Sequence, residues 1–156
     1  MAGVKYALSV LGVICLLGCG DPLNAELVPG PELTPEDVVR IQLEALRNND
    51  AEDRGIAVAF RFASPANRRA TGPLPRFARM IKEEPYDLML HYEEARFGPI
   101  EEESENAARQ RVILLDRGAV RQYIFQLSRR RFEPCEGCWM TDSVLVDEDA
   151  LQRIAL

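Results

Sequence analysis

The sequence predicts an α+β fold in which N-terminal helices pack on a curved antiparallel sheet. Apolar residues recur at helical spacing between residues 34 and 84 and at strand spacing after residue 86. Turn-forming residues separate the strand-length runs. Helices followed by an antiparallel meander are typical of the α+β class, in which helices cover one face of a sheet.

The first helix is predicted to begin at Thr34. Threonine can cap the first turn, Pro35 suits the first helical position, and Asp37 can return the capping-box hydrogen bond. The apolar residues that follow form one broad stripe, and the charged residues between them face away from it. The polar run Asn48–Asp50 ends this helix.

Two further helices are predicted, over residues 51–63 and 75–84. In both, apolar residues fall at helical spacing. The stretch Ser64–Asn67 ends the second helix. Residues 68–75 contain Gly72 and two prolines, so we expect a loop or a tight bend there.

Four strands are predicted, of which the first has the weakest pattern. They span His91–Ile100, Arg109–Asp116, Ala119–Arg131 and Trp139–Val146. The acidic run Glu101–Asn106 is predicted to be a hairpin loop, and Asp116-Arg117-Gly118 a tight turn. Tyr123, Phe125 and Leu127 alternate with polar residues, which places them on one face of the third strand.

The composition is that of an ordinary globular domain. Of the 156 residues, 47% are hydrophobic and 28% are charged, which argues against wholesale disorder. The formal net charge of −6 argues against general nucleic-acid binding, because phosphate affinity needs a basic face. His91 is the single histidine, so a multi-histidine metal site is excluded. We expect no metal, no other cofactor and no nucleic-acid partner.

Residues 1–18 have the order of a secretory signal. Lys5 precedes an apolar run from Ala7 to Leu17, which would span only about 16 Å as a helix and is too short to cross a membrane comfortably. The tetrapeptide Leu16–Cys19 resembles a bacterial lipobox. That resemblance implies that Cys19 receives a diacylglycerol thioether and becomes the new N-terminus. A plain signal peptide and an uncleaved short anchor remain alternatives.

This interpretation divides the chain into four parts. Residues 1–18 are the lipoprotein signal peptide, and residues 19–33 are the lipidated cysteine and a flexible tether rich in proline and glycine. Residues 34–147 form a single α+β domain, and residues 148–156 form a C-terminal tail or short helix. We expect a periplasm-facing protein held to the bacterial envelope by its lipid. Gly20 beside the lipidated cysteine favours the outer over the inner membrane.

Several stretches carry a resemblance to a known family. In chain order they are Val38–Leu46, Phe62–Asn67, Gly72, Phe77–Met80, Leu127–Arg129 and Trp139. Together they resemble the family catalogued as domain of unknown function 4864, roughly from Leu33 to Val146. The resemblance implies a cone of the nuclear-transport-factor-2-like type, with three helices over a curved antiparallel sheet. It implies no activity, so no catalytic residue is carried over.

Cys135 and Cys138 form a CxxC pair with three interpretations. A redox dithiol places its first cysteine at a helix N-terminus, whereas Pro134 precedes this pair and a strand follows it. A zinc site needs four ligands, and the sequence offers no second CxxC. In an oxidising compartment we expect a structural disulfide that positions Trp139.

Asn67, Arg68, Arg69 and Arg129 are the candidate ligand-binding residues. Arginine side chains suit carboxylates and phosphates. Strand alternation places Arg129 on the inward face, with Asp142 or Glu93 as its ionic partner. The alternative is that these residues serve as helix-end caps, solvated arginines and a structural ion pair.

A second set could carry chemistry: Asp87, His91, Tyr92 and Asp142. A carboxylate base facing a buried tyrosine is one arrangement found in isomerases. The leading hypothesis is nevertheless a non-catalytic module that binds a small apolar or anionic ligand or an envelope protein. A cavity isomerase, dehydratase or hydrolase and an envelope thiol–disulfide protein are the alternatives. A homodimer is possible, and nothing in the sequence selects it.

Overall fold

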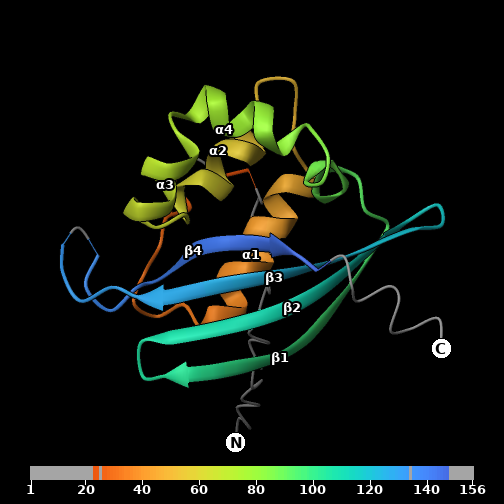
Figure 1. Cartoon of the computed structure of the whole chain (residues 1–156). Coiled ribbons are helices and arrows are strands. Elements are labelled where there is room, and N and C mark those ends of the chain that lie inside the picture. Colours follow the sequence, from red (N-terminus) through yellow and green to blue (C-terminus); the bar gives the residue numbers. More distant parts are fainter. Residues whose placement is uncertain (1–22, 25, 134, 148–156) are drawn as a thin grey trace, which may run out of the picture.

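The computed structural model describes residues 23–24, 26–133 and 135–147. Within these residues, four α-helices and one short 3-10 helix pack against a four-stranded antiparallel sheet (Figure 1). The helices are α1 (Pro35–Arg47), α2 (Arg54–Arg61), α3 (Pro65–Thr71), α4 (Leu74–Ile81) and η1 (Asp87–Leu90). The strands, in both chain and sheet order, are β1 (Glu94–Ser104), β2 (Ala107–Asp116), β3 (Ala119–Arg129) and β4 (Trp139–Val146). The α+β class is therefore confirmed.

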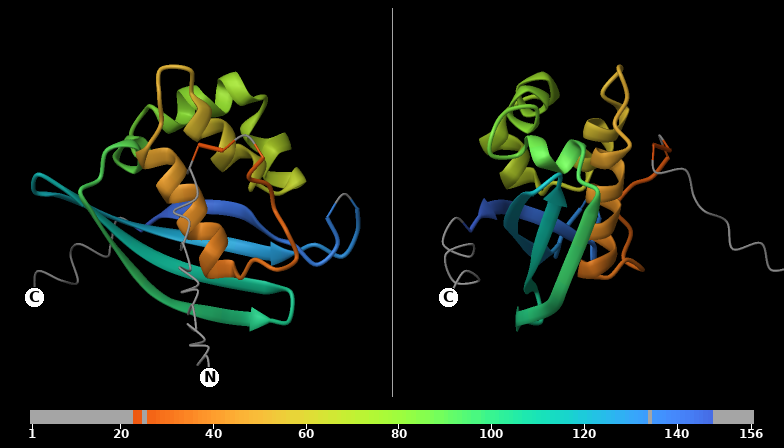
Figure 2. Two further views of the ribbon diagram at one scale, coloured as in Figure 1. Left: turned by 180° about the vertical axis from the view of Figure 1, so that it is seen from behind. Right: turned by 90° about the vertical axis from the view of Figure 1, so that its right-hand side faces the viewer.

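The first helix forms as its capping signals predict. The Thr34 side chain accepts the backbone N–H of Asp37, and the Asp37 carboxylate accepts the backbone N–H of Thr34 at 2.9 Å. Val38, Val39 and Leu43 of the apolar stripe of α1 are fully buried. Figure 2 shows α1 crossing one face of the sheet, with α2 to α4 stacked toward its β4 side.

The second helix begins later than predicted because two side chains of the preceding turn cap it. The backbone N–H of Ile56 donates to Asn49 Oδ1 at 3.0 Å, and that of Arg54 donates to Asp50 Oδ1 at 2.9 Å. A Cβ at Gly55 would lie only 2.1 Å from the carbonyl oxygen of Ala45. Glycine is therefore required where α2 crosses closely over α1.

Residues 65–71 form a helix, α3, where the sequence predicts a break followed by a loop. Ser64 caps it by accepting the backbone N–H of Asn67 at 3.2 Å, and Pro65 occupies the first helical turn. The helix ends at Gly72, whose φ of +86° suits glycine. The Ser-Pro pair is thus a helix start rather than only the end of α2.

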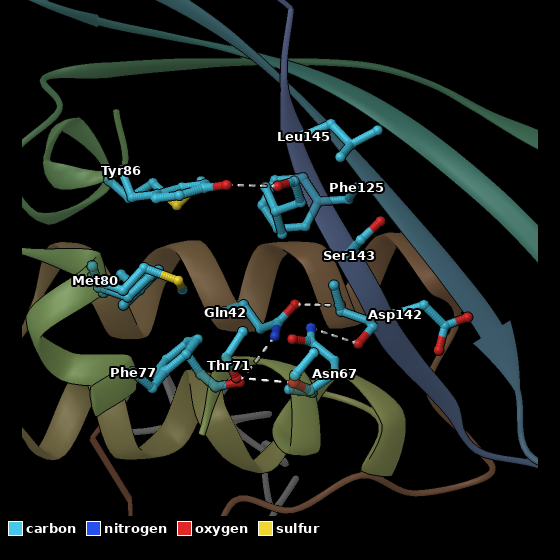
Figure 3. A pocket seen from close by; sticks show the side chains of 18 residues that line it. Gln42, Asn67, Thr71, Phe77, Met80, Tyr86, Phe125, Asp142, Ser143 and Leu145 are labelled. Carbon is cyan, nitrogen blue, oxygen red and sulfur yellow. Dashed lines mark hydrogen bonds between the residues drawn. The ribbon is translucent and has the colours of Figure 1, made fainter. Parts of the chain in front are cut away.

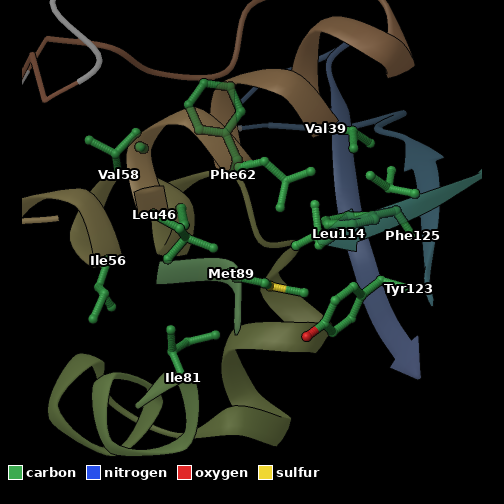
Figure 4. Close-up of a cluster of buried hydrophobic side chains, with 14 of the residues drawn as sticks. Val39, Leu46, Ile56, Val58, Phe62, Ile81, Met89, Leu114, Tyr123 and Phe125 are labelled. Carbon is green, nitrogen blue, oxygen red and sulfur yellow. The ribbon is translucent and has the colours of Figure 1, made fainter. Parts of the chain in front are cut away.

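The sheet buries the face that the alternation predicts. Tyr123, Phe125 and Leu127 are each at most 2% exposed and belong to the core drawn in Figure 4. Arg117 and Gly118 form the tight turn between β2 and β3, both at positive φ. The predicted range of β4 is confirmed.

The first strand differs from its prediction. Residues 101–104 belong to β1, so the predicted acidic loop is wrong and the turn to β2 comes after Ser104. The carboxylate of Glu101 accepts a hydrogen bond from Arg109 Nε at 2.7 Å and also binds Arg111. These arginines on the neighbouring strand compensate the acidic charge, which sequence alternation along β1 alone does not reveal.

The edge strand β4 is joined to the junction between α2 and α3. Thr141 donates its backbone N–H to the carbonyl of Phe62 at 2.9 Å, and its own carbonyl accepts the N–H of Ser64 at 2.8 Å. Beside Thr141 the register between β3 and β4 shifts at Asp142. These bonds set the separation between the helices and the sheet edge, where the pocket lies.

The described part of the expected tether rests on the domain. Leu27 and Leu33 pack against the core. The guanidinium of Arg61 donates to the carbonyl oxygens of Leu27 and Asn24, each at 3.1 Å. The expected lipidation site and the expected C-terminal tail lie outside the described residues. No helix in the described part of the chain is long and apolar enough to cross a membrane.

Candidate functional site

A cavity of about 290 Å³ lies between the helices and β4 (Figure 3). Its walls are mainly apolar. The apolar lining residues are Leu46, Ala59, Ala63, Ala70, Phe77, Met80, Ile81, Met89, Phe125, Val144 and Leu145. Four α-helices, the short helix η1 and two strands thus contribute to one site.

The local sequence explains how each element reaches this cavity. Phe77, Met80 and Ile81 stand three and four residues apart, which places them on one face of α4. Gln42 and Leu46 are similarly one turn apart on α1. The inner face of the sheet supplies Phe125 from β3, beside β4.

A polar corner lies at one end of the cavity. The hydroxyl of Thr141, which is fully buried, donates to Gln42 Oε1 at 2.6 Å. Gln42 Nε2 donates to the carbonyl oxygen of Ala59 at 2.9 Å. Gln42 is itself only 5% exposed, so its amide is fixed by groups from α2 and β4.

Asn67 joins the same corner from α3. Its Nδ2 donates to the carbonyl oxygen of Thr141 at 3.1 Å, and Thr71 Oγ1 donates to the carbonyl oxygen of Asn67 at 2.9 Å. At the other end of the cavity, the Tyr86 hydroxyl donates to the carbonyl oxygen of Val144 at 3.2 Å. Most polar atoms of the lining are therefore already bonded within the protein.

No charged group in the described part of the chain points into the cavity. Among the described residues that line it, Asp142 is the single charged one, and none is lysine, arginine or histidine. Asp142 is exposed, and Figure 3 shows its carboxylate directed away from the cavity. The site therefore suits an uncharged ligand better than an ion.

The predicted anion-binding residues do not gather in one place. Asn67 lines the cavity, whereas Arg68, Arg69 and Arg129 do not. Arg129 is exposed, and its Nε donates to the carbonyl oxygen of Gly137 at 3.1 Å. The predicted inward position of Arg129 is therefore wrong, because this last residue of β3 turns to the loop that follows.

The predicted acid–base residues do not meet at the cavity either. Tyr92 is 5% exposed and belongs to the core, where burial raises the pKa of its hydroxyl. His91 is half exposed, with Nδ1 3.0 Å from Asp116 Oδ2 and Nε2 3.9 Å from Asp87 Oδ2. Of the four predicted residues only Asp142 lines the cavity.

Cys135 and Cys138 are joined by a disulfide. Cys138 is fully buried, and Cys135 Sγ lies 3.4 Å from the carbonyl oxygen of Pro29 in the N-terminal segment. The disulfide loop therefore contacts that segment and also binds Arg129. Among the described residues, no group of three or more His, Cys, Asp and Glu side chains could hold a metal ion.

Sequence reasoning missed the two residues at the centre of the polar corner. Gln42 interrupts the apolar stripe of α1, and Thr141 occupies an inward position of β4. A polar residue within an apolar stripe is the signal that could have indicated Gln42. The pairing of these two residues, 99 positions apart, has no local signature.

The fold and the site define a small helix-on-sheet protein with a neutral, mainly apolar pocket. The chain matches the model of the family described as Domain of unknown function (DUF4864) over residues 31–154, and it belongs to that family. No curated protein and no solved structure matches the chain.

Proposed function

We propose that this protein binds a small apolar molecule in the pocket between its helices and β4, with no chemistry of its own. The observation that carries the proposal is an apolar cavity whose interior holds no charge and whose polar lining is largely satisfied. Ligand pockets are usually concave and mostly apolar, with a few placed polar groups. At about 30 Å³ per atom, the cavity takes about ten non-hydrogen atoms.

We further propose that the domain acts at the surface of a bacterial envelope membrane. The order of residues 1–19 supports removal of the signal and acylation of Cys19. Leu27 and Leu33 are docked on the domain, so the segment that begins at Leu23 lies close to it. Only three residues separate Leu23 from Cys19. At about 3.6 Å per residue, the lipid would hold Leu23 within about 14 Å of the membrane.

Native mass spectrometry tests the ligand proposal. The processed chain, residues 19–156 with Cys19→Ser, would be secreted into a bacterial periplasm and contains every residue that the structure describes. We expect a complex heavier than the chain by one small molecule, which organic solvent removes. Met80→Lys places a charge in the wall and should abolish the complex, whereas Arg79→Lys on the exposed face should not. A bare chain that also fails to take up added apolar compounds would refute the proposal.

The intact mass of the membrane-bound protein tests the anchor. We expect a mature chain that begins at Cys19 and carries acyl chains, with Cys19→Ser as the unlipidated control. An unmodified cysteine in the mature protein would contradict the lipoprotein interpretation.

A further inference from the structure

We infer that the ligand carries an uncharged hydroxyl group, which binds between the side-chain amides of Gln42 and Asn67. This inference rests on the proposed function and specifies the ligand that the pocket takes. It is carried by the hydrogen-bonding groups that remain open at the polar corner.

The orientation of both amides is determined by their partners. Gln42 Nε2 faces the carbonyl oxygen of Ala59, and Asn67 Nδ2 faces the carbonyl oxygen of Thr141. A carbonyl oxygen can only accept, so the nitrogen and oxygen of each amide cannot be exchanged. The corner therefore presents a defined set of donors and acceptors.

Three groups of this set are open. An amide nitrogen carries two hydrogens; Gln42 Nε2 uses one of them for Ala59, and Asn67 Nδ2 uses one of them for Thr141, so each amide keeps one open N–H. Asn67 Oδ1 accepts no hydrogen bond from the described residues. Thr141 binds both side chains, Gln42 through its hydroxyl and Asn67 through its carbonyl, so the open donors and the open acceptor share one corner. Both residues line the cavity.

A hydroxyl group satisfies this corner. It can donate its hydrogen to Asn67 Oδ1 and accept the second N–H of Gln42. A carboxylate only accepts, so it would face Asn67 Oδ1 without a donor and without a cation in the lining. An ammonium only donates, and it would enter a neutral apolar site unpaired. A pure hydrocarbon leaves all the open groups without a partner.

The rest of the ligand is apolar. Met80, Phe77, Phe125 and Val144 form apolar parts of the cavity wall. With room for about ten non-hydrogen atoms, an eight-carbon chain with one hydroxyl group fits the cavity. The chemical class is therefore a medium-chain or small cyclic alcohol.

Isothermal titration of the Cys19→Ser processed chain with four probes of similar size tests the inference. The probes are 1-octanol, octanoate, octylammonium and butylbenzene. We expect octanol to bind at least tenfold more tightly than each of the others. Addition of octanol should also shift the side-chain amide signals of Gln42 and Asn67 in a proton–nitrogen correlation spectrum.

Two variants distinguish the contribution of the ligand's hydroxyl group to affinity from that of the apolar wall. Asn67→Leu removes the open acceptor and should weaken octanol binding about tenfold while butylbenzene binding stays the same or strengthens. Met80→Leu, in the apolar wall, should keep the preference for octanol. If Asn67→Leu does not fold, the shifts of the Gln42 and Asn67 amide signals, measured on the protein without this substitution, test whether octanol binds at the polar corner.

The outcomes distinguish the two proposals. Failure of all four probes to bind would overturn both the proposed function and this inference. Binding of butylbenzene or octanoate as tightly as octanol would leave a ligand pocket and overturn the hydroxyl inference alone. Unshifted amide signals on octanol binding would overturn it equally.

Discussion

Thr141 donates its hydroxyl to the side-chain carbonyl of Gln42 across 2.6 Å, which joins β4 to α1 at the polar corner of the pocket. Both side chains are buried, and Thr141 also binds the backbone of Phe62 and Ser64. One residue therefore links the sheet edge to three helices. This makes it both a stability determinant and the support of the proposed binding groups.

Replacement of Thr141 by valine should destabilise the domain by about 1–3 kcal/mol, because Gln42 Oε1 would be left buried without a partner. Urea denaturation followed by tryptophan fluorescence measures this loss. Ser143→Ala on the same strand is the control. Its hydroxyl bonds the exposed Gln126, so we expect a change of at most about 0.5 kcal/mol. Equal losses in the two variants would contradict the argument.

Replacement of Arg61 by methionine should release the N-terminal segment. The guanidinium holds the carbonyls of Asn24 and Leu27, and its loss should lower the global stability by only about 1 kcal/mol. Hydrogen exchange in residues 26–33 should become clearly faster. Arg69→Met removes an exposed arginine of α3 and should leave that exchange unchanged. Unaltered protection in the Arg61 variant would show that Leu27 and Leu33 hold the segment without it.

Tyr123 should make stability depend on pH in the alkaline range. Burial raises the pKa of its hydroxyl from 10.0 to about 12. The unfolded chain therefore loses this proton first, so the stabilisation is complete below pH 10 and is lost as the pH rises towards 12. Urea denaturation over this range should show the loss, and Tyr123→Phe should lack it. Tyr86→Phe is the control. If the free energy of unfolding of Tyr123→Phe falls with pH as steeply as that of the native protein, Tyr123 is not the cause of the loss.

Lys82 and Asp53 should contribute to stability only above acidic pH. The Lys82 ammonium, 2.8 Å from Asp53 Oδ2, holds the pKa of that carboxyl below its ordinary 3.8. The contribution is therefore present above about pH 4 and lost as the pH falls through the lowered pKa. Because Lys82 is half exposed, we expect at most about 1 kcal/mol. The difference between the native protein and Lys82→Met should vanish at acidic pH, and a constant difference would refute this origin.

The disulfide should have a modest effect on stability. Closure of so short a loop contributes about 2 kcal/mol in the chain-entropy model. A variant with alanine at both Cys135 and Cys138 should remain folded and unfold at a lower urea concentration. The intact mass of the native protein should be two hydrogens below that of its reduced form. A mass equal to the reduced form would show that the thiols are free.

Local sequence signals predicted much of the secondary structure. The capping box of Thr34 and Asp37 and the turn at Arg117 and Gly118 depend on residues within four positions of one another. The buried face of β3 follows from simple alternation. Ser64-Pro65 shows the limit of predictions from local signals, because the same pair can end one helix and begin the next.

The pairing of charged side chains between neighbouring strands could not be predicted from local sequence. Residues 101–104 are acidic enough to suggest a loop. They form a strand in which Arg109 lies opposite Glu101 and Arg111 also binds its carboxylate. The prediction that Arg129 points inward was wrong for a related reason. Its surroundings are set by the loop that contains Gly137 rather than by strand alternation.

The sequence by itself determined the fold class, the first helix, the buried face of β3, the range of β4 and the membership in a family. These depend on periodicity and on neighbouring residues. Only the tertiary structure decided the pocket, because Gln42, Asn67 and Thr141 come from three separate elements and meet through hydrogen bonds between distant parts of the chain. No local pattern encodes which buried polar groups bond to one another. The amide groups that stay open at the pocket are therefore determined only by how the helices pack on the sheet.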